Sequence, residues 1–242
     1  MTTIENDPKP GFPFSMIEGM MPMYPMIAFV GWMIVLIAFF IGLLVLAPAQ
    51  SSFLSDAKAV REAAGAGSAF VDANVASHVI EAWLPQFKFL GLGMGLMAIT
   101  MALGTIAKKL RHMGKVIAAH MPSKLRPPTP PIPGRVRMFQ LSTMMGLMLI
   151  LTVLIIGVVL ATGVVPEYWN HSIANELNGA EAGSALLGQF ATIQSYALWL
   201  NPLRMTGMAF FFTGILLTLT VIIGTLRLQS MMLSRFYEQA SK

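Results

Sequence analysis

His78 and Glu81 are of types that could move a proton or bind a metal ion, and they lie three residues apart. In a helix this spacing places the imidazole and the carboxylate on one face, where they can act as an acid–base pair or as metal ligands. The alternative is a solvated polar face. A comparison within the chain favours this alternative. Residues 182–207 resemble residues 66–91, and Gln194 and Ala197 stand at the positions of His78 and Glu81, so neither group is kept.

Met20, Met21 and Met23 form a second candidate site, beside proline and glycine. Thioethers are soft ligands suited to Cu(I), so copper is the one cofactor that this sequence suggests. The alternative is that methionine serves as a flexible apolar filler, in a chain that contains 20 of them. The absence of cysteine excludes disulfides, thiolate-bound zinc and Cys-bound iron–sulfur clusters. We otherwise predict no cofactor.

The elements that carry these residues are those of a membrane protein. The 242 residues have a mean hydropathy of +0.68, and only 11% are charged, against about 25% in soluble domains. Four long uncharged runs, each able to cross a hydrocarbon core of about 30 Å as a helix, predict an all-α protein with four transmembrane helices. The predicted spans are residues 26–46, 89–107, 138–165 and 205–226.

These four spans contain no Asp, Glu, Lys, Arg or His. Pumps, ion-coupled transporters and b-type cytochromes need such groups at depth, for charge transfer or haem ligation. The sequence therefore argues against all three classes, and we predict no enzymatic activity. The hydroxyl groups of the spans are expected to bond to the preceding helical turn or across a helix pair.

The segment 108–137 sets the predicted orientation, because it carries eight Lys and Arg residues and no acidic residue. Short loops rich in Lys and Arg stay in the cytoplasm (the positive-inside rule), which places both termini there, in a membrane such as the bacterial inner membrane. We expect anionic lipid headgroups, and no nucleic acid, as partners of these bases. Those nearest the second span are Lys108, Lys109, Arg111 and Lys115.

The chain then divides into an arm, two pairs of spans, a basic loop and a tail. Proline at high density predicts an irregular arm, and Pro85 is expected to bend the chain into the second span. The external connections are expected to contain amphipathic helical segments. The predicted parts are residues 1–25, 26–107 with external connection 47–88, 108–137 with a polyproline II stretch at 127–133, 138–226 with external connection 166–204, and 227–242, where the last helix continues to residue 237.

Residues 66–91 resemble residues 182–207, with seven identities in 26 positions, and this predicts an internal duplication. The matches begin with Ala-Gly-Ser-Ala in the loop, outside the apolar runs, where similar composition alone does not explain them. Trp83 corresponds to Trp199, and both are expected to anchor their helices at the external interface. Two tandem two-helix repeats would be related by a pseudo-two-fold axis along the membrane normal.

Small residues are the expected helix-packing sites, because lipid gives no hydrophobic drive for helices to associate. Gly91 and Gly95 form one flat surface on the second span, and Gly207 and Gly214 form another on the fourth. The predicted function is a non-catalytic subunit of a larger membrane complex, with other membrane-protein subunits as partners. The alternatives are a binding or carrier protein for a lipid, quinone or other apolar small molecule, and copper handling by the methionines.

Overall fold

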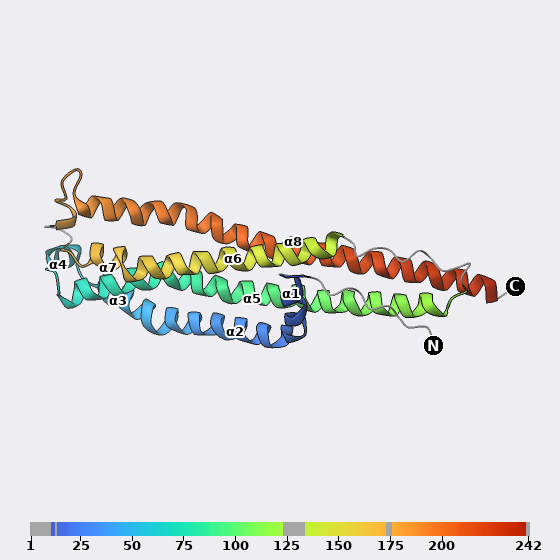
Figure 1. The fold of residues 1–242 in the computed structure, drawn as a ribbon. Helices are drawn as coiled ribbons and strands as arrows, with labels where there is room; N and C mark the ends of the chain where they lie inside the picture. The colour runs from blue at the N-terminus through green and yellow to red at the C-terminus, as the bar shows by residue number, and fades with distance from the viewer. Residues whose placement is uncertain (1–10, 13, 123–133, 173–175, 241–242) are drawn as a thin grey trace. The chain divides into compact units, whose positions relative to one another are not determined.

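The structure, a computed structural model, describes residues 11–12, 14–122, 134–172 and 176–240. Among these residues the regular structure is entirely helical, without a strand. Four helical segments are long and apolar enough to cross a membrane, residues 14–55, 69–120, 134–169 and 185–238. The prediction of an all-α, multi-pass architecture with four long apolar helices is therefore confirmed, and it is compatible with an integral membrane location (Figure 1).

The first segment begins earlier than the sequence predicted. The expectation of an irregular arm up to residue 25 is wrong for residues 14–25, since prolines in the first turn of a helix lose no hydrogen bond. Pro22, Pro25 and Pro48 each follow the first residue of an element. The elements are α1 (Phe14–Met20), a 3₁₀ turn η1 (Met21–Met23), α2 (Tyr24–Ile41), a π-helical turn η2 (Gly42–Leu46) and α3 (Ala47–Ser55).

The later helices are also longer than the predicted spans. After α4 (Lys58–Ala63), α5 (Ala69–His120) runs for 52 residues through Pro85, so the proline does not end the helix. The basic segment is helical up to His120, whereas the predicted polyproline stretch lies outside the described residues. The chain continues with α6 (Gly134–Thr162), α7 (Val164–Trp169) and α8 (Ala185–Ala240), and α8 extends into the tail as predicted.

The chain forms two compact units. Unit 1 comprises residues 1–29, 95–146 and 209–242, and unit 2 comprises residues 30–94 and 147–208. In unit 1 the helices pack through small and hydroxyl residues. A Cβ atom at Gly214 of α8 would lie 3.1 Å from Thr143 Oγ1 of α6, and Ser142 Oγ donates to the Phe210 carbonyl at 2.6 Å.

The hydroxyl groups of the spans bond as predicted. Most threonines donate to a carbonyl three or four residues earlier, and Ser142 bonds across a helix pair. The hydroxyl groups of the threonines are thus satisfied by carbonyls of their own helices. The threonines that bond within their helix are Thr100, Thr105, Thr143, Thr152, Thr162, Thr206, Thr213, Thr218, Thr220 and Thr225.

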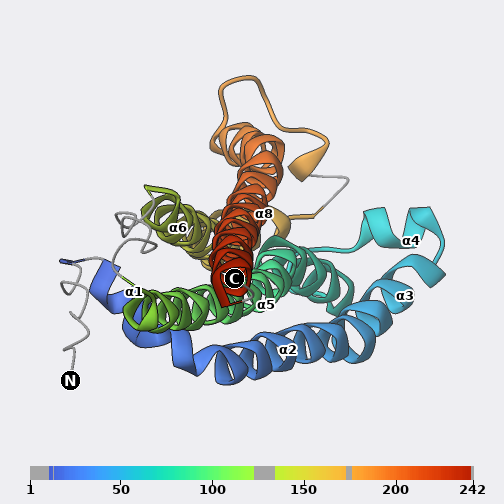
Figure 2. The ribbon, with the colours of Figure 1, turned by 90° about the vertical axis from the view of Figure 1, so that its right-hand side faces the viewer.

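In unit 2 the first half of α5 packs against several other helices. Its core includes Val153 of α6 and Leu200 of α8, both buried. The chain leaves α2 through α3 and α4 and returns to begin α5 (Figure 2). Glycines set the closest approaches, because a Cβ atom at Gly91 would lie 2.7 Å from the Gly31 carbonyl oxygen of α2.

The first turns of α5 and α8, both in unit 2, are built in the same way. In each Ala-Gly-Ser-Ala sequence the glycine has a positive φ, +75° at Gly67 and +82° at Gly183, and no other described residue has one. Ser68 and Ser184 then cap their helices, since each Oγ accepts from the amide three residues on at 3.4 Å. The preceding loop bonds also correspond, at 3.2 and 3.1 Å.

Candidate functional site

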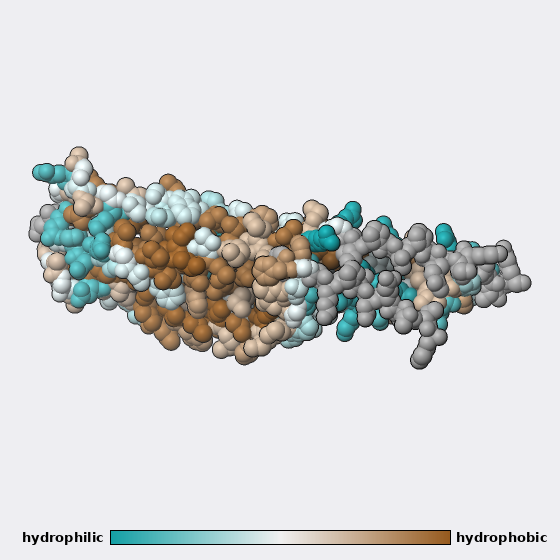
Figure 3. Space-filling model, in the orientation of Figure 1, coloured by the Kyte–Doolittle hydropathy of each residue, from teal (hydrophilic) through white to brown (hydrophobic). Residues whose placement is uncertain are grey.

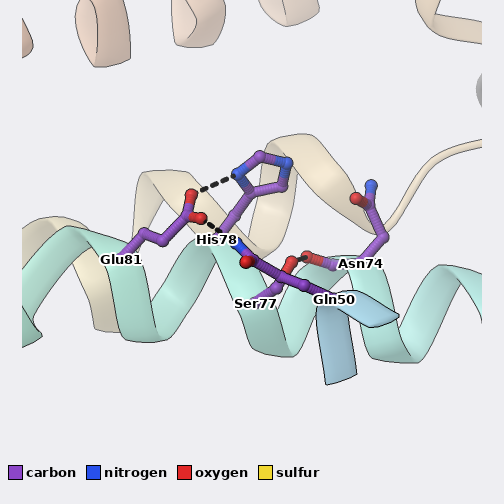
Figure 4. Close-up of polar contacts among 5 residues, drawn as sticks. All are labelled: Gln50, Asn74, Ser77, His78 and Glu81. Atoms are coloured by element: carbon purple, nitrogen blue, oxygen red, sulfur yellow. Dashed lines mark hydrogen bonds and ion pairs between the residues drawn. The ribbon is translucent and has the colours of Figure 1, made fainter. Parts of the chain in front are cut away.

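His78 and Glu81 come together in unit 2, on the polar first half of α5. His78 Nδ1 lies 3.3 Å from Glu81 Oε2, and Gln50 of α3 donates from Nε2 to the other carboxylate oxygen (Figure 4). The imidazole stacks on Trp169 of α7, with 3.8 Å between ring centroids and 13° between planes. The side chain of Asn74 points away from the carboxylate (Figure 4).

This arrangement ties α5 to α3 and α7. Both carboxylate oxygens of Glu81 have partners, and one face of the imidazole is covered by the indole ring. Metal binding would need further ligands, and the described residues contain no group of three or more His, Cys, Asp or Glu that could hold an ion. In this geometry His78 and Glu81 form a contact between helices.

The methionines of the candidate copper site lie in different environments. Met21 is buried in unit 1, where its side chain would contact a Cβ atom at Gly104 of α5 at 3.2 Å. Met20 is half-buried, and Met23 is 47% exposed. Met21 thus fills the space left by a glycine, which is the packing role described above as the alternative.

The four glycines chosen for helix packing differ from one another. Gly91 contacts α2 closely, and Gly214 contacts Thr143 and Thr100. Gly207 is buried, whereas a Cβ atom at Gly95 would meet nothing within 4 Å. Close contacts also occur at Gly104 and Gly157, which lie outside the two predicted pairs because neither has a second glycine at a spacing that would form a groove with it.

The two tryptophans named as anchors begin Trp-Leu pairs with similar burial. Leu84 and Leu200 are buried, while Trp83 is half-buried and Trp199 is 39% exposed. Each indole contacts an aromatic ring of its own helix, Phe87 for Trp83 and Tyr196 for Trp199. The two positions are thus alike in burial and differ in the direction of the ring contact.

The basic residues after the second span lie on α5 in unit 1. Lys108 pairs with Glu18 of α1 at 3.1 Å, and Lys109 is exposed. Arg111 and Lys115 are half-buried and each has an interaction of its own. The helix continues beside the end of α8, where Gln229 Nε2 donates to the Leu110 carbonyl at 2.6 Å.

A second polar site in unit 2 joins the proline turns of α5 and α8. Arg204 Nη1 donates to Gln86 Oε1 at 3.1 Å, and its Nη2 donates to Asn201 Oδ1. The guanidinium carbon lies 4.3 Å from the centroid of the Phe89 ring. We refer to Gln86, Phe89, Asn201 and Arg204 as the arginine site.

α5 continues through Pro85, and the side chain of the next residue, Gln86, bonds to the preceding turn. Proline has no amide hydrogen, and its ring pushes against the carbonyl of the preceding turn. Gln86 Nε2 donates to the Ala82 carbonyl of that turn at 3.3 Å. A glycine on α6 leaves room for this side chain, since a Cβ atom at Gly157 would lie 2.7 Å from Gln86 Cγ.

In the alignment of residues 66–91 with residues 182–207, Arg204 corresponds to Lys88, and no residue of this site was singled out from the sequence. An available signal was an amide residue beside each proline, Gln86 after Pro85 and Asn201 before Pro202. Comparison of the chain with sequence models of protein families, with curated proteins and with solved structures finds no match.

Proposed function

We propose that this protein is a non-catalytic integral-membrane subunit of a larger membrane complex. The supporting observation is Trp32 of α2, which is 66% exposed and lies within four residues of the middle of the predicted span 26–46. Tryptophan is normally enriched at the membrane–water interface, where its N–H can reach a polar partner. No hydrogen bond to the Trp32 indole is found among the described residues.

The helix that carries Trp32 is the least covered of the four. In its most apolar stretch 11% is buried, against 39% in α5. Hydrophobic residues are prominent on the surface of this part of the molecule (Figure 3). Phe39 and Phe40 of α2 are each more than half exposed. Aromatic residues are enriched in protein interfaces. A partner helix on α2 would supply both packing and an acceptor for the indole.

A site-specific photocrosslinker tests this proposal. p-Benzoylphenylalanine placed at Trp32 should give one adduct of defined mass with a membrane protein that co-purifies in mild detergent at a fixed ratio. The matched control is Ile155 of α6, which is 62% exposed and apolar. Trp32→Ala should reduce recovery of that protein about tenfold, in the range of a tryptophan hot spot.

Two results would contradict the proposal. One is purification of the intact chain with lipid alone, in detergent that preserves other complexes of the same membrane. The other is crosslinking at Trp32 that yields only lipid adducts, as expected at Ile155. Normal recovery of the partner with Trp32→Ala would show that Trp32 does not lie in the interface, and the proposal would lose the observation on which it depends.

We also propose that the two halves of the chain arose by internal duplication, with the repeats as predicted from residues 66–91 and 182–207. The support comes from the corresponding glycine conformations, serine caps and buried leucines at the same offset. Superposition of residues 66–107 on 182–226 in an experimental structure should bring Trp83 and Trp199 together. Unrelated paths of the two segments would refute it.

A further inference from the structure

Arg204 is a cation without an acidic partner among the described residues. Its two terminal nitrogens donate to the amide oxygens of Gln86 and Asn201, which are neutral acceptors. Its Nε is buried and has no hydrogen-bond partner. The guanidinium is therefore held in position while its charge is left uncompensated.

The contacts of α5 with α2 place the arginine site inside an apolar run. A Cβ atom at Gly91 would lie 2.9 Å from Val35 Cγ2, in the middle of the uncharged run of α2. A Cβ atom at Gly42, near the end of the same run, would lie 3.9 Å from Leu84 Cδ2. Gln86 lies between Leu84 and Gly91 on α5, so it is level with the interior of this run.

The contact with α6 gives the same level. A Cβ atom at Gly157 would lie 2.7 Å from Gln86 Cγ, and Gly157 lies eight residues, about 12 Å along a helix, before the end of the uncharged run of α6. By its place in the sequence, just before the run 205–226, Arg204 would lie at the membrane edge. Its bond to Gln86 and its contact with the Phe89 ring place the guanidinium further in.

A charge at this level is costly, and charged residues within membrane spans pair with an opposite charge. A guanidinium has five N–H donors in a planar fork that matches the two oxygens of a carboxylate. The amides use two donors, so others remain for an anion. The predicted spans of this chain contain neither Asp nor Glu. A carboxylate at this level therefore comes from a different protein and not from the spans of this chain or of a second copy.

The face of α8 beside Arg204 is open to such a partner. Leu198 and Met205 are 78% and 52% exposed, and they lie seven residues apart, so they form one stripe with the exposed Asn201 between them. Asparagine in a membrane helix forms hydrogen bonds across helix pairs. We refer to Leu198, Asn201 and Met205 as the α8 stripe. A helix packed on it would bring its side chains next to the guanidinium.

We propose that the α8 stripe binds a transmembrane helix of a partner subunit, and that an Asp or Glu of that helix pairs with Arg204. Gln86 and Asn201 are positioning residues, because they orient the guanidinium and do not neutralise it. The proposal rests on the proposed function, a subunit of a larger complex, and adds the chemistry of the partner.

A photocrosslinker on the α8 stripe identifies the occupant. p-Benzoylphenylalanine placed at Leu198 of the full chain in its membrane should give an adduct with another membrane protein. Mass spectrometry should locate the adduct in an apolar segment that carries an Asp or Glu. The matched control is the exposed Ile155 of α6, which should give lipid adducts. Adducts at Leu198 with lipid alone, with a second copy of this chain or with a segment without an acid would overturn the proposal.

A double-mutant cycle tests the charge pair. Arg204→Gln should lower recovery of the partner in mild detergent at least about tenfold, as for loss of one member of a buried charge pair. Changing the partner's acid to its amide should cause a similar loss, and the two changes together should lose little more. Lys88→Gln is the matched control, since it removes an exposed cation at the corresponding position of α5. Equal losses in Arg204→Gln and Lys88→Gln, or additive losses in the cycle, would overturn the proposal.

Asn201→Asp provides a test that does not require removing the arginine. The aspartate keeps the oxygen that accepts from Nη2 and supplies the missing charge within the chain. Recovery of the partner should fall, and the thermal unfolding temperature of the isolated chain should rise. If the wild type retains its partner and both Asn201→Asp and Arg204→Gln retain it equally, this proposal fails and the proposed function stands. If the wild type purifies with lipid alone, the proposed function fails, and this proposal fails with it.

Discussion

α5 and α8 begin with the same local structure and then differ in the side chains they carry and in the helices that those side chains contact. Both start with a left-handed glycine and a capping serine, and both carry a Trp-Leu pair beside a proline turn. Between cap and proline, α5 has polar residues, of which His78 contacts α7 and Glu81 contacts α3, whereas α8 has other residues at those positions. The pairs are Asn74 and Phe190, Ser77 and Ile193, His78 and Gln194, and Glu81 and Ala197.

The difference shows which features a helix needs for itself and which depend on its neighbours. A start signal acts on the backbone within one turn, so it is the same in both helices. The polar contacts depend on what lies across from them. α5 therefore has the His78–Glu81 contact, and α8 has Arg204, which reaches back to Gln86 on α5.

The largest expected effect is at Gly91, where α5 meets α2 most closely. Gly91→Ala would place a Cβ atom 2.7 Å from the Gly31 carbonyl oxygen, which is backbone and cannot turn aside. We expect a loss of about 1–3 kcal/mol in the free energy of unfolding. Gly95→Ala is the control, because nothing lies within 4 Å of its Cβ position. If a denaturant titration gives the same free energy of unfolding for both variants, α2 does not pack closely against α5 at Gly91.

Gly67→Ala and Gly183→Ala test whether the two helix starts are equivalent. Neither Cβ atom would contact anything, so the cost comes only from the positive φ. Each change should destabilise the protein by about 1–2 kcal/mol, and the two values should agree. Gly65→Ala serves as the control, since its φ is not positive. A cost at one glycine only, measured by thermal unfolding, would break the correspondence between α5 and α8.

His78→Ala tests the feature in which the two helices differ. Loss of the stack on Trp169 should cost about 0.5–1.5 kcal/mol, the range for aromatic pairs. Gln194→Ala, at the corresponding exposed position of α8, should cost little. Trp169 fluorescence in a variant whose other tryptophans are phenylalanine should also change with His78→Ala. Unchanged emission would show that the rings do not stack in the membrane-bound protein.

The smallest expected difference is between Trp83 and Trp199. Single-tryptophan variants should show similar emission maxima and similar quenching by brominated lipids, because both indoles precede an apolar run as interfacial anchors. Trp32 is the comparison within the same chain, and lipids brominated near the middle of the bilayer should quench it more strongly. If Trp83 and Trp199 lie at different depths in the bilayer, they are not equivalent interfacial anchors.

The amino-acid sequence by itself determined the four long helices, because an uncharged apolar run carries its membrane preference in its own composition. It also predicted the bonding of the threonines, which involves a carbonyl one turn away. It misjudged the start of the first helix near proline, since Pro22 and Pro25 fall in first turns.

Only the tertiary structure decided which distant residues meet. Gln86 and Arg204 are 118 residues apart, and neither was paired with the other by any spacing in the sequence. The same holds for the stacking of Trp169 on His78, for the hydrogen bond from Gln50 to Glu81 and for the close approach of Gly157 to Gln86. Such contacts depend on how separate helices approach one another. That approach is set by the shapes of whole helix faces, which no local pattern records.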